Sequence, residues 1–374
     1  MRTQSLPLRP STRPNHPINI MQIGIDTFVE TTLASGRVPG ELGAERVRQL
    51  LEEIELADRS GVDVYGIGEH HREEYIASAP AILLAAAAAR TQNIRLTSAV
   101  TVLSSDDPVR VFQDFATLDL ISQGRAEIIV GRGSFIESYP LFGYDTKHYD
   151  ELFSEKLDLL LHLRDQVRVQ WEGKHRASLT GQGVWPRPLQ TQLPIRLGVG
   201  GTPESFVRAG MLGLPLTVAI IGGQPHRFRP LIDLYREAGR RAGHASESLD
   251  VAIHVVGFLA DTPQQAADTL WPAYSTTFTR IGRERGWPPA TRAAFDAQRS
   301  EDGAFFLGDP DTVARKAWTV SDALGGVSRI TLMMSGGPIP HTAMLHSIHL
   351  LGAGVAPQLH GIVPQNATPV KEKS

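Results

Sequence analysis

The stretch ELGAERVRQLLEEIELADRSGVDVYGIG, residues 41–68, decides the fold of this chain. Its first part carries apolar residues at helical spacing on one stripe, which predicts an amphipathic helix that ends at Gly61. The apolar run that follows, 62–68, has the composition of a strand, and a similar run at 23–28 precedes the helix. Strand, helix and strand in this order predict parallel pairing, because the helix carries the chain back to the start of the next strand.

The same alternation continues along the rest of the chain. Eight short β-branched or apolar runs occur, most of them followed by a segment of helical period: 23–28, 62–68, 94–103, 126–131, 194–200, 215–220, 251–260 and 328–334. Eight βα units in one chain predict an α/β fold, a closed (β/α)₈ TIM barrel rather than an open doubly wound sheet.

Two connections are longer than a barrel needs. The first, 145–193, follows the fourth strand and contains a helix and a small hairpin. The second, 261–308, follows the seventh strand and is long enough to form a lid or a substrate loop. Since both follow strand C-termini, we expect both on the face where barrel active sites lie.

The core is predicted to be one domain, residues 21–354. Residues 1–20 are rich in Pro and Arg and show no periodicity, which predicts a disordered N-terminal extension or an upstream start codon ahead of Met21. They lack the continuous apolar run of a secretory signal. The Pro-interrupted residues 355–374 are predicted to be a C-terminal tail.

Composition excludes several classes of function. The chain has 37 Lys and Arg against 40 Asp and Glu, so its formal net charge is −3, which argues against a nucleic-acid partner. It has no cysteine, which removes disulfides and thiolate chemistry and fits a reducing compartment, so we expect a cytoplasmic protein. No apolar run approaches the ~18 residues of a membrane-spanning helix.

The densest polar cluster, GEHHREE at 68–74, follows the second predicted strand. Glu69, His70 and His71 stand side by side, and the two histidines point to opposite faces if the strand continues. Histidine is the side chain best suited to move a proton near neutral pH, although an isolated cluster of this kind can also be a solvated loop. The spacings H-E-x-x-H and H-x-H are missing, so we expect no metal.

GRGSF, 131–135, follows the fourth predicted strand. Gly133 permits close approach of the backbone, and Arg132 offers a planar cation suited to a phosphate. Taken alone this is a common loop sequence, so its weight depends on what lies beside it.

GVGGTPESF, 198–206, joins the fifth predicted strand to a helix. Gly200 and Gly201 free the backbone, Thr202 is a candidate N-cap, and Ser205 lies in the first turn. A helix N-terminus with free amides and hydroxyls is suited to hold a phosphate, although it can also be a capped helix that binds nothing. Because strands four and five are neighbours, we expect one phosphate to touch both this segment and the arginine of the preceding motif.

AVTVLSSDDP, 99–108, ends the third predicted strand with small residues and hydroxyls. Ala99, Val100 and Ser104 could lie against a planar ring, or the segment could be an ordinary barrel strand with a polar turn. There is no G-x-G-x-x-G after the first strand, no P-loop and no G-x-S-x-G, so nicotinamide-binding Rossmann, NTPase and serine-hydrolase functions lack their signatures.

These motifs, in this order, resemble the bacterial luciferase-like family of flavin-dependent monooxygenases. The resemblance covers about residues 21–351 and is carried by EIELADRSGVDVYGIGEHH (53–71), SAVTVLSSDDPVR (98–110), DLISQGRAEIIVGRGSF (119–135), LFGYD (141–145), GGTPESF (200–206), GLP (213–215), LIDLYREA (231–238) and GDPDTV (308–313). Each segment alone is modest, but together at barrel spacing they are specific.

The resemblance implies FMN held across the barrel mouth, reduced by a separate NAD(P)H:flavin reductase, and O₂ used through a peroxyflavin to oxidise a small organic substrate. It implies that His70, flanked by Glu69 and His71, is a proton-transfer group.

For the cofactor, the resemblance implies that Arg132, Thr202 and Ser205 hold the phosphate. A cis peptide is implied between Ala99 and Val100, beneath the flavin ring. Residues around Trp271, Tyr274, Arg283, Arg285 and Trp287 would form a lid that excludes water.

The sequence also departs from the family pattern. Gly131 stands where luciferase has a reactive cysteine beside the flavin, which would widen the pocket at this point. Aldehyde oxidation and light emission are therefore not implied. Two alternatives stay open, a deazaflavin-dependent oxidoreductase and a flavin-binding protein without turnover.

The oligomeric state comes from the resemblance alone. Relatives pair through helices near the first strands, so a homodimer or higher homo-oligomer is expected. The Ala-rich segment 79–90 either packs across that two-fold or against its own barrel.

Overall fold

The computed structural model describes residues 20–31, 38–335, 337 and 339–361. The predicted N-terminal extension therefore lies outside the described residues, apart from Ile20. Among the described residues, no helix combines the length and the apolar character needed to cross a membrane.

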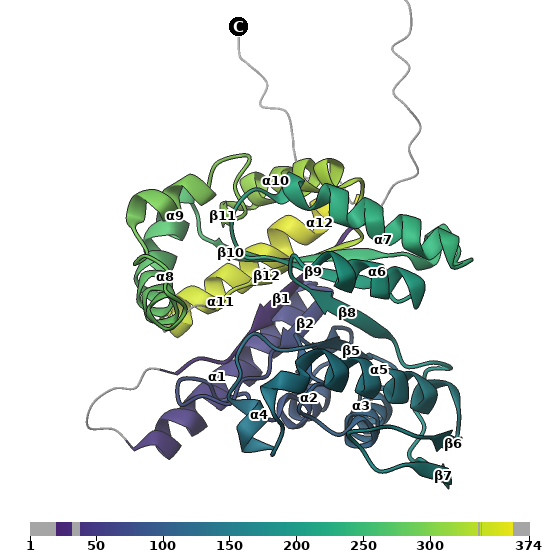
Figure 1. Cartoon of the computed structure of the whole chain (residues 1–374). Helices are drawn as coiled ribbons and strands as arrows, with labels where there is room; N and C mark the ends of the chain where they lie inside the picture. Colours follow the sequence, from purple (N-terminus) through teal and green to yellow (C-terminus); the bar gives the residue numbers. More distant parts are fainter. Residues whose placement is uncertain (1–19, 32–37, 336, 338, 362–374) are drawn as a thin grey trace, which may run out of the picture.

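A closed barrel of parallel strands forms the centre of the molecule (Figure 1). In the described part of the chain its strands are β1 (Gln22–Thr27), β2 (Val64–Ile67), β3 (Arg95–Ser98), β5 (Ala126–Gly131), β8 (Ile195–Val199), β9 (Leu216–Ile220), β10 (Val251–Leu259) and β12 (Arg329–Met333). They pair in chain order, and β12 pairs with both β10 and β1, so the sheet closes on itself. The predicted (β/α)₈ TIM barrel is confirmed, and each predicted run contains one of these strands.

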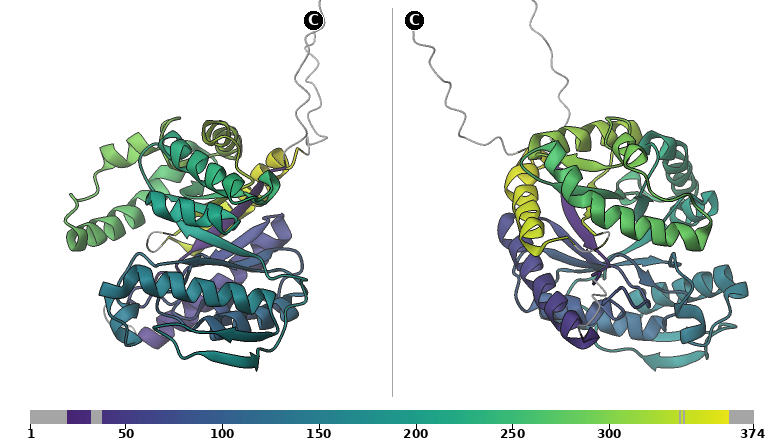
Figure 2. Two further views of the ribbon diagram at one scale, coloured as in Figure 1. Left: turned by 45° about the vertical axis from the view of Figure 1, so that its right-hand side comes forward. Right: turned by 90° about the vertical axis from the view of Figure 1, so that its left-hand side faces the viewer.

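Helices surround the barrel on its outer side (Figure 2). The covering helices are α1 (Pro39–Ser60), α2 (Pro80–Ala88), α3 (Pro108–Ser122), α5 (Tyr149–Asp165), α6 (Pro203–Met211), α7 (Arg229–Arg241), α10 (Pro310–Leu324) and α11 (His341–Leu350). Several of them begin with proline in the first turn, where the missing N–H would have no helical partner. Asp107 and Asp309 cap two of these starts by accepting backbone N–H groups.

Shorter elements complete the chain. They are β4 (Thr101–Val102), α4 (Ser138–Leu141), η1 (Thr146–His148), β6 (Arg168–Trp171), β7 (Leu179–Gly183), η2 (Pro225–Phe228), η3 (Ser246–Ser248), α8 (Pro263–Arg285), α9 (Arg292–Gln298), β11 (Phe306–Gly308), η4 (Leu351–Val355) and α12 (Ala356–Leu359). β4 pairs with β5 and β11 with β10, so both extend the barrel wall at its mouth.

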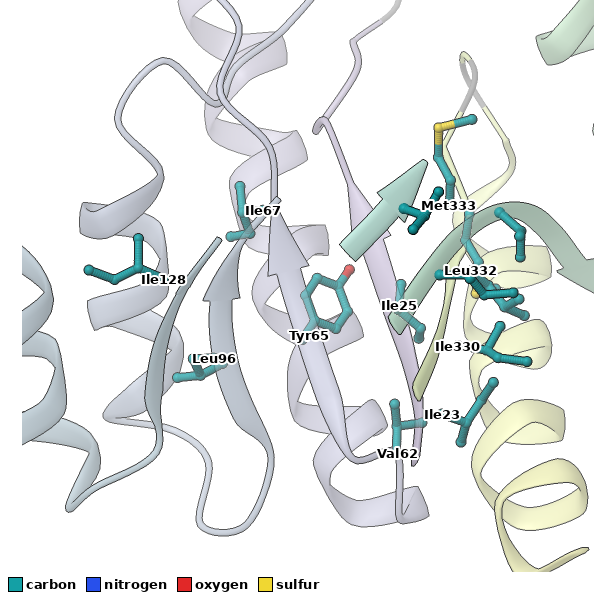
Figure 3. Packing of buried hydrophobic residues seen from close by; sticks show 14 of the residues in the cluster. Ile23, Ile25, Val62, Tyr65, Ile67, Leu96, Ile128, Ile330, Leu332 and Met333 are labelled. Atoms are coloured by element: carbon teal, nitrogen blue, oxygen red, sulfur yellow. The ribbon is translucent and has the colours of Figure 1, made fainter. Parts of the chain in front are cut away.

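The apolar core lies between the strands and the helices rather than inside the barrel. Figure 3 shows part of it, including Ile23 and Ile25 of β1 and Ile330 and Leu332 of β12, all buried. The alternate residues of these strands face the barrel axis, because side chains alternate along a strand. Many of the inward-facing residues are polar or charged, and this gives the barrel interior its chemistry.

The two long connections take different positions. β6 and β7 form the predicted hairpin, but it packs outside α5, and none of its residues lines the cavity described below. The expectation that both insertions lie on the active-site face is therefore wrong for the hairpin, because it follows a helix rather than a strand. α8 and α9 do follow the seventh strand, and α8 reaches the mouth.

The C-terminal tail begins later than predicted. Ala356–Leu359 form α12, Leu359 is fully buried, and its carbonyl accepts the N–H of Met21. Pro357 lies in the first turn of this helix, where proline is tolerated, so it did not mark the end of the fold. Residues 362–374 lie outside the described part.

Candidate active site

A cavity of about 480 Å³ opens at the C-terminal ends of the barrel strands. Loops or strand ends from β1, β2, β4, β5, β8, β9, β10 and β12 contribute to its wall, together with the C-terminal half of α8. Its size and its largely apolar wall are those of a small-molecule site. It lies where TIM-barrel enzymes place their chemistry.

The predicted phosphate motifs meet on one side of this cavity. Nη2 of Arg132 lies 3.2 Å from Oγ of Ser205, although the two residues are 73 positions apart. Nη1 of Arg132 bonds Asp150 at 2.6 Å, and the guanidinium lies over the ring of Tyr149. The arginine is thus held toward the start of α6 from two sides.

The start of α6 has free hydrogen-bonding groups. Thr202 occupies the N-cap position, as predicted, but its side chain makes no cap hydrogen bond, so the hydroxyl is available to a ligand. Gly200 and Gly201 line the cavity, and a Cβ added to either would meet open space. The bare backbone, the helix N-terminus and Arg132 thus lie together in an arrangement suited to an anion, which we call the anion cradle.

His70 lies in an aromatic surrounding. Its ring is 4.6 Å from the rings of Phe28 and Tyr75 and 4.9 Å from that of Phe135, measured between centroids. Burial, with smaller contributions from His71, Arg72 and Arg285, lowers the pKa of His70 to about 3. At neutral pH the imidazole is therefore uncharged, and it can offer a hydrogen bond but not act as an acid.

Glu69 and His71 are bonded to each other, unlike His70, which lies among aromatic rings. Oε1 of Glu69 bonds Nε2 of His71 at 2.8 Å, and Oε2 accepts the N–H of Val102 at 2.8 Å. Glu69 lines the cavity, whereas His71 turns away from it and lies against Phe142. The carboxylate thus fixes Val102, the last residue of β4, beside the cavity.

The peptide between Ala99 and Val100 is cis, as the family resemblance implied. Both residues line the cavity. The side chain of Val100 covers Gly131 and Gly198, so closely that a Cβ on either glycine would lie 2.7 Å from it. The pocket is therefore not widened at Gly131, because Val100 fills the space that a larger residue would take.

Ser104 does not reach the cavity, contrary to expectation. It is fully buried beneath β4, and its carbonyl accepts Nζ of Lys156 at 2.8 Å. Burial lowers the pKa of that lysine to about 8. This contact ties the loop after β4 to α5.

The lid residues divide into two groups. Arg285 and Trp287 line the cavity, and Arg285 donates to the carbonyl of Ser134 at 2.7 Å. Trp271 and Tyr274 instead pack with Phe295 inside the insertion, and the exposed Arg283 does not line the cavity. Trp271, Tyr274 and Arg285 lie on one stripe of α8, so position along the helix decides this division. The middle of the helix packs inside the insertion, and its C-terminal end reaches the cavity.

Phe278 and Ile281, one turn apart on α8, line the cavity and were not singled out from the sequence. Nor were Asp26 on β1 and His254 on β10, which form a buried pair at 2.6 Å in the cavity wall. A lone charged residue within an apolar strand is the signal that could have pointed to both.

One further cluster lies outside the cavity. Glu151 bonds His148 and His175 at 3.2 and 3.1 Å, and the three could surround a cation. Nζ of Lys174 bonds the same carboxylate oxygen at 2.9 Å and supplies the counter-charge. We interpret the group as a surface ion-pair cluster that ties the hairpin to α5.

The fold and this site define a barrel enzyme with an anion cradle beside an apolar cavity. The chain belongs to the luciferase-like monooxygenase family, whose model matches residues 25–326. The predicted class of enzyme, a monooxygenase of this family, is confirmed.

Named relatives support the same class. The chain is 29% identical to N-acetyl-S-alkylcysteine monooxygenase of Bacillus subtilis (strain 168) over 61% of its length, and this match covers 66% of the relative, slightly under two thirds. It is 27% identical to 4-hydroxyprotoasukamycin monooxygenase of Streptomyces nodosus subsp. asukaensis, over 86% of this chain and 90% of the relative.

Solved structures share the barrel. The oxygenating component of 3,6-diketocamphane monooxygenase of Pseudomonas putida, solved with FMN, has a TM-score of 0.72 at 20% identity, over 90% of this chain and 98% of that one. An F420-dependent secondary alcohol dehydrogenase has a TM-score of 0.70 at 17% identity, over 91% of this chain and 99% of that one. At these identities the likeness concerns the fold.

Proposed function

We propose that the protein is an FMN-dependent monooxygenase that uses reduced flavin and O₂ to oxidise a small, largely apolar organic molecule. The observation that carries this proposal is the convergence of Arg132, Ser205 and the uncapped start of α6 on one anion cradle beside the cavity.

The residues present suit FMN. Arg132 would pair with the phosphate, while the hydroxyl of Thr202 and the free N–H groups at the start of α6 would complete its hydrogen bonds. The open space over Gly200 and Gly201 leaves room for the phosphate to approach the backbone. Bound there in reduced form, the flavin would supply the electrons that activate O₂.

The chain itself supplies a dry, shaped surrounding. Phe28, Phe135 and Phe278 line the wall, and the end of α8 closes over it. Such a wall excludes water, which protects reactive species and strengthens polar contacts inside. His70, neutral at pH 7, would orient a polar atom in this wall as a hydrogen-bonding partner.

The end of α8 is fastened across the mouth. Arg72 forms two bonds with Glu284 of α8, at 2.6 and 2.8 Å, and lies over the ring of Phe135. Release of these contacts would open the cavity to substrate and product.

Flavin titration tests the phosphate assignment. The wild-type protein should quench FMN fluorescence on binding and should bind riboflavin, which lacks the phosphate, much more weakly. Arg132→Ala should weaken FMN binding by ~1.5–3 kcal/mol, roughly 10- to 150-fold, because it removes a charge-assisted contact. Arg283→Ala, which removes an exposed arginine that does not line the cavity, serves as the matched control. Equal affinity of Arg132→Ala and wild type for FMN would refute the assignment.

A deazaflavin-dependent oxidoreductase is the second candidate, since solved barrels of this shape include an F420-dependent dehydrogenase. Oxygen consumption separates the two, because a deazaflavin enzyme would not consume O₂ when supplied with reduced cofactor.

Two partners are part of the same proposal. A separate NAD(P)H:flavin reductase would supply the reduced flavin. A second copy of the chain would form a homodimer. α2 packs beside α1 and α3 of its own chain, yet Ile82 on its outer side is 71% exposed. Light scattering would give the dissolved mass and decide the second point.

A further inference from the structure

Asp26 of β1 and His254 of β10 are 228 positions apart in the sequence, and they meet at the wall of the cavity. Nδ1 of His254 lies 2.6 Å from Oδ2 of Asp26, and both side chains are buried. The other oxygen of Asp26, Oδ1, is buried and has no hydrogen-bond partner among the described residues. An incompletely bonded carboxylate in a protein interior is costly, so its presence needs an explanation.

The neighbouring strands leave room for this pair. Gly66 lies beside Asp26 in the register of β1 and β2, and a Cβ there would clash with Oδ1. Ala219 lies beside His254 in the register of β9 and β10 and also lines the cavity. Small residues next to both members therefore leave space for the pair in the cavity wall.

The pairing decides which nitrogen of His254 is free. A carboxylate accepts a hydrogen bond, so Nδ1 of His254 donates its N–H to Asp26. Nε2 is then left with a lone pair, and no group of the described residues bonds it.

We propose that the Asp26–His254 pair recognises the hydroxyl group of an aromatic substrate, with Nε2 of His254 accepting the O–H. The inference rests on the proposed function, because it concerns the substrate of the same cavity. The aromatic and aliphatic wall around the pair, with Phe28, Phe278 and Met333, suits an apolar ring. An acceptor beside such apolar side chains favours a donor group on the ligand.

The same contact allows a balanced proton transfer. The substrate O–H bond breaks, its proton joins Nε2, and the electron pair stays on the oxygen. The imidazolium that forms is stabilised by the carboxylate of Asp26 through the Nδ1–H hydrogen bond. A phenol-class ring becomes more electron-rich as its oxygen takes up negative charge, which favours attack by an electrophilic oxygen donor.

Three probes of one scaffold test the proposal in the full chain, with and without FMN. 4-Nitrophenol offers an O–H donor, 4-nitroanisole replaces it by a methyl ether, and 4-nitroacetophenone offers an acceptor. The wild-type protein should bind 4-nitrophenol at least ten-fold more tightly than either other probe. The bound phenol should show nitrophenolate absorbance at a pH where free 4-nitrophenol is still largely protonated.

Asp26→Asn provides the sharper test, because it reverses the tautomer. The amide N–H₂ would donate to Nδ1, so Nε2 would carry the proton and become a donor. The variant should lose its preference for 4-nitrophenol and bind 4-nitroacetophenone more tightly than wild type does. His254→Asn should lose the nitrophenolate signal. The matched control is His346→Asn, which disrupts an exposed His–Asp pair bonded at 2.8 Å.

The outcomes separate the two proposals. Equal affinity of the wild-type protein for 4-nitrophenol and 4-nitroanisole overturns the inference, whether or not FMN binds. Loss of FMN binding with intact probe selectivity contradicts the proposed cofactor but not the pair. If Asp26→Asn does not fold, the wild-type comparison and His254→Asn still decide.

Discussion

The base and the mouth of the barrel both hold buried charged residues, but they satisfy them differently. At the base, Arg329 makes two bonds to Glu127, at 2.6 and 3.2 Å, and a third to Gln22. At the mouth, Asp26 has one partner, His254, and one oxygen without any. The two regions lie on the same strands, so the contrast does not come from the type of secondary structure.

The difference shows how a structural charge can be told from a functional one in this protein. A second base arginine, Arg196, bonds Asp250, Thr217 and the carbonyl of Leu216, so each of its three nitrogens has a partner in the protein. At the mouth, by contrast, some groups keep a free lone pair or a free hydroxyl, as Thr202 does, and so remain available.

Neutralising one carboxylate in each region sharpens this comparison and should give the largest effect. Glu127→Gln should lower the free energy of unfolding by about 3–5 kcal/mol, because it leaves Arg329 buried without its counter-charge. Asp26→Asn should cost at most about 1 kcal/mol, because the amide keeps a hydrogen bond to Nδ1 of His254 and replaces a charge-assisted bond by a neutral one. Urea denaturation of the full chain measures both.

Similar losses for the two variants would contradict the distinction between base and mouth. The slope of the unfolding free energy against urea concentration is the internal control. If this slope falls together with the unfolding midpoint, the denatured or native ensemble has changed.

The second prediction concerns His70 at the mouth, which should make the free energy of unfolding depend on pH. We expect this effect to be smaller than that of Glu127→Gln. Unfolded histidine takes up a proton near pH 6.5, whereas folded His70 does so only near a pKa of about 3. Between these values the unfolded state binds more protons. The contribution of the neutral His70 ring to the free energy of unfolding is therefore complete above about pH 6.5. It is lost as the pH falls, by up to ~1.4 kcal/mol per pH unit.

His70→Phe should flatten this slope when unfolding is followed between pH 6 and 4. An unaltered slope in His70→Phe would show that this ring is not held neutral by its aromatic surrounding.

The smallest effect is expected at the rim of the mouth. Glu284→Gln removes the charge that pairs with Arg72, but the glutamate side chain is 42% exposed and screened by water. We expect a loss of at most about 1 kcal/mol, decreasing with added salt. Hydrogen exchange at the end of α8 should nevertheless become faster, since this pair fastens the helix across the cavity. Unchanged exchange there would argue against a fastening role.

The sequence by itself determined the order of elements, the barrel and the meeting of Arg132 with the start of α6 beside the cavity. Each of these depends on short-range information: helical or alternating periodicity, proline at helix starts, and glycine beside Thr202 at a strand end. The same information located His70, but not its lowered pKa, which depends on rings brought from β1 and the loop after β5.

Only the tertiary structure decided which side chains meet inside the barrel. Asp26 and His254 were missed, Ser104 proved to be buried below the cavity, and Val100 filled the space above Gly131. The physical reason is that side chains alternate along a strand, so a one-residue change of register turns every side chain to the opposite face. Register across a closed barrel is set by all its strands together, and no single segment of sequence contains it.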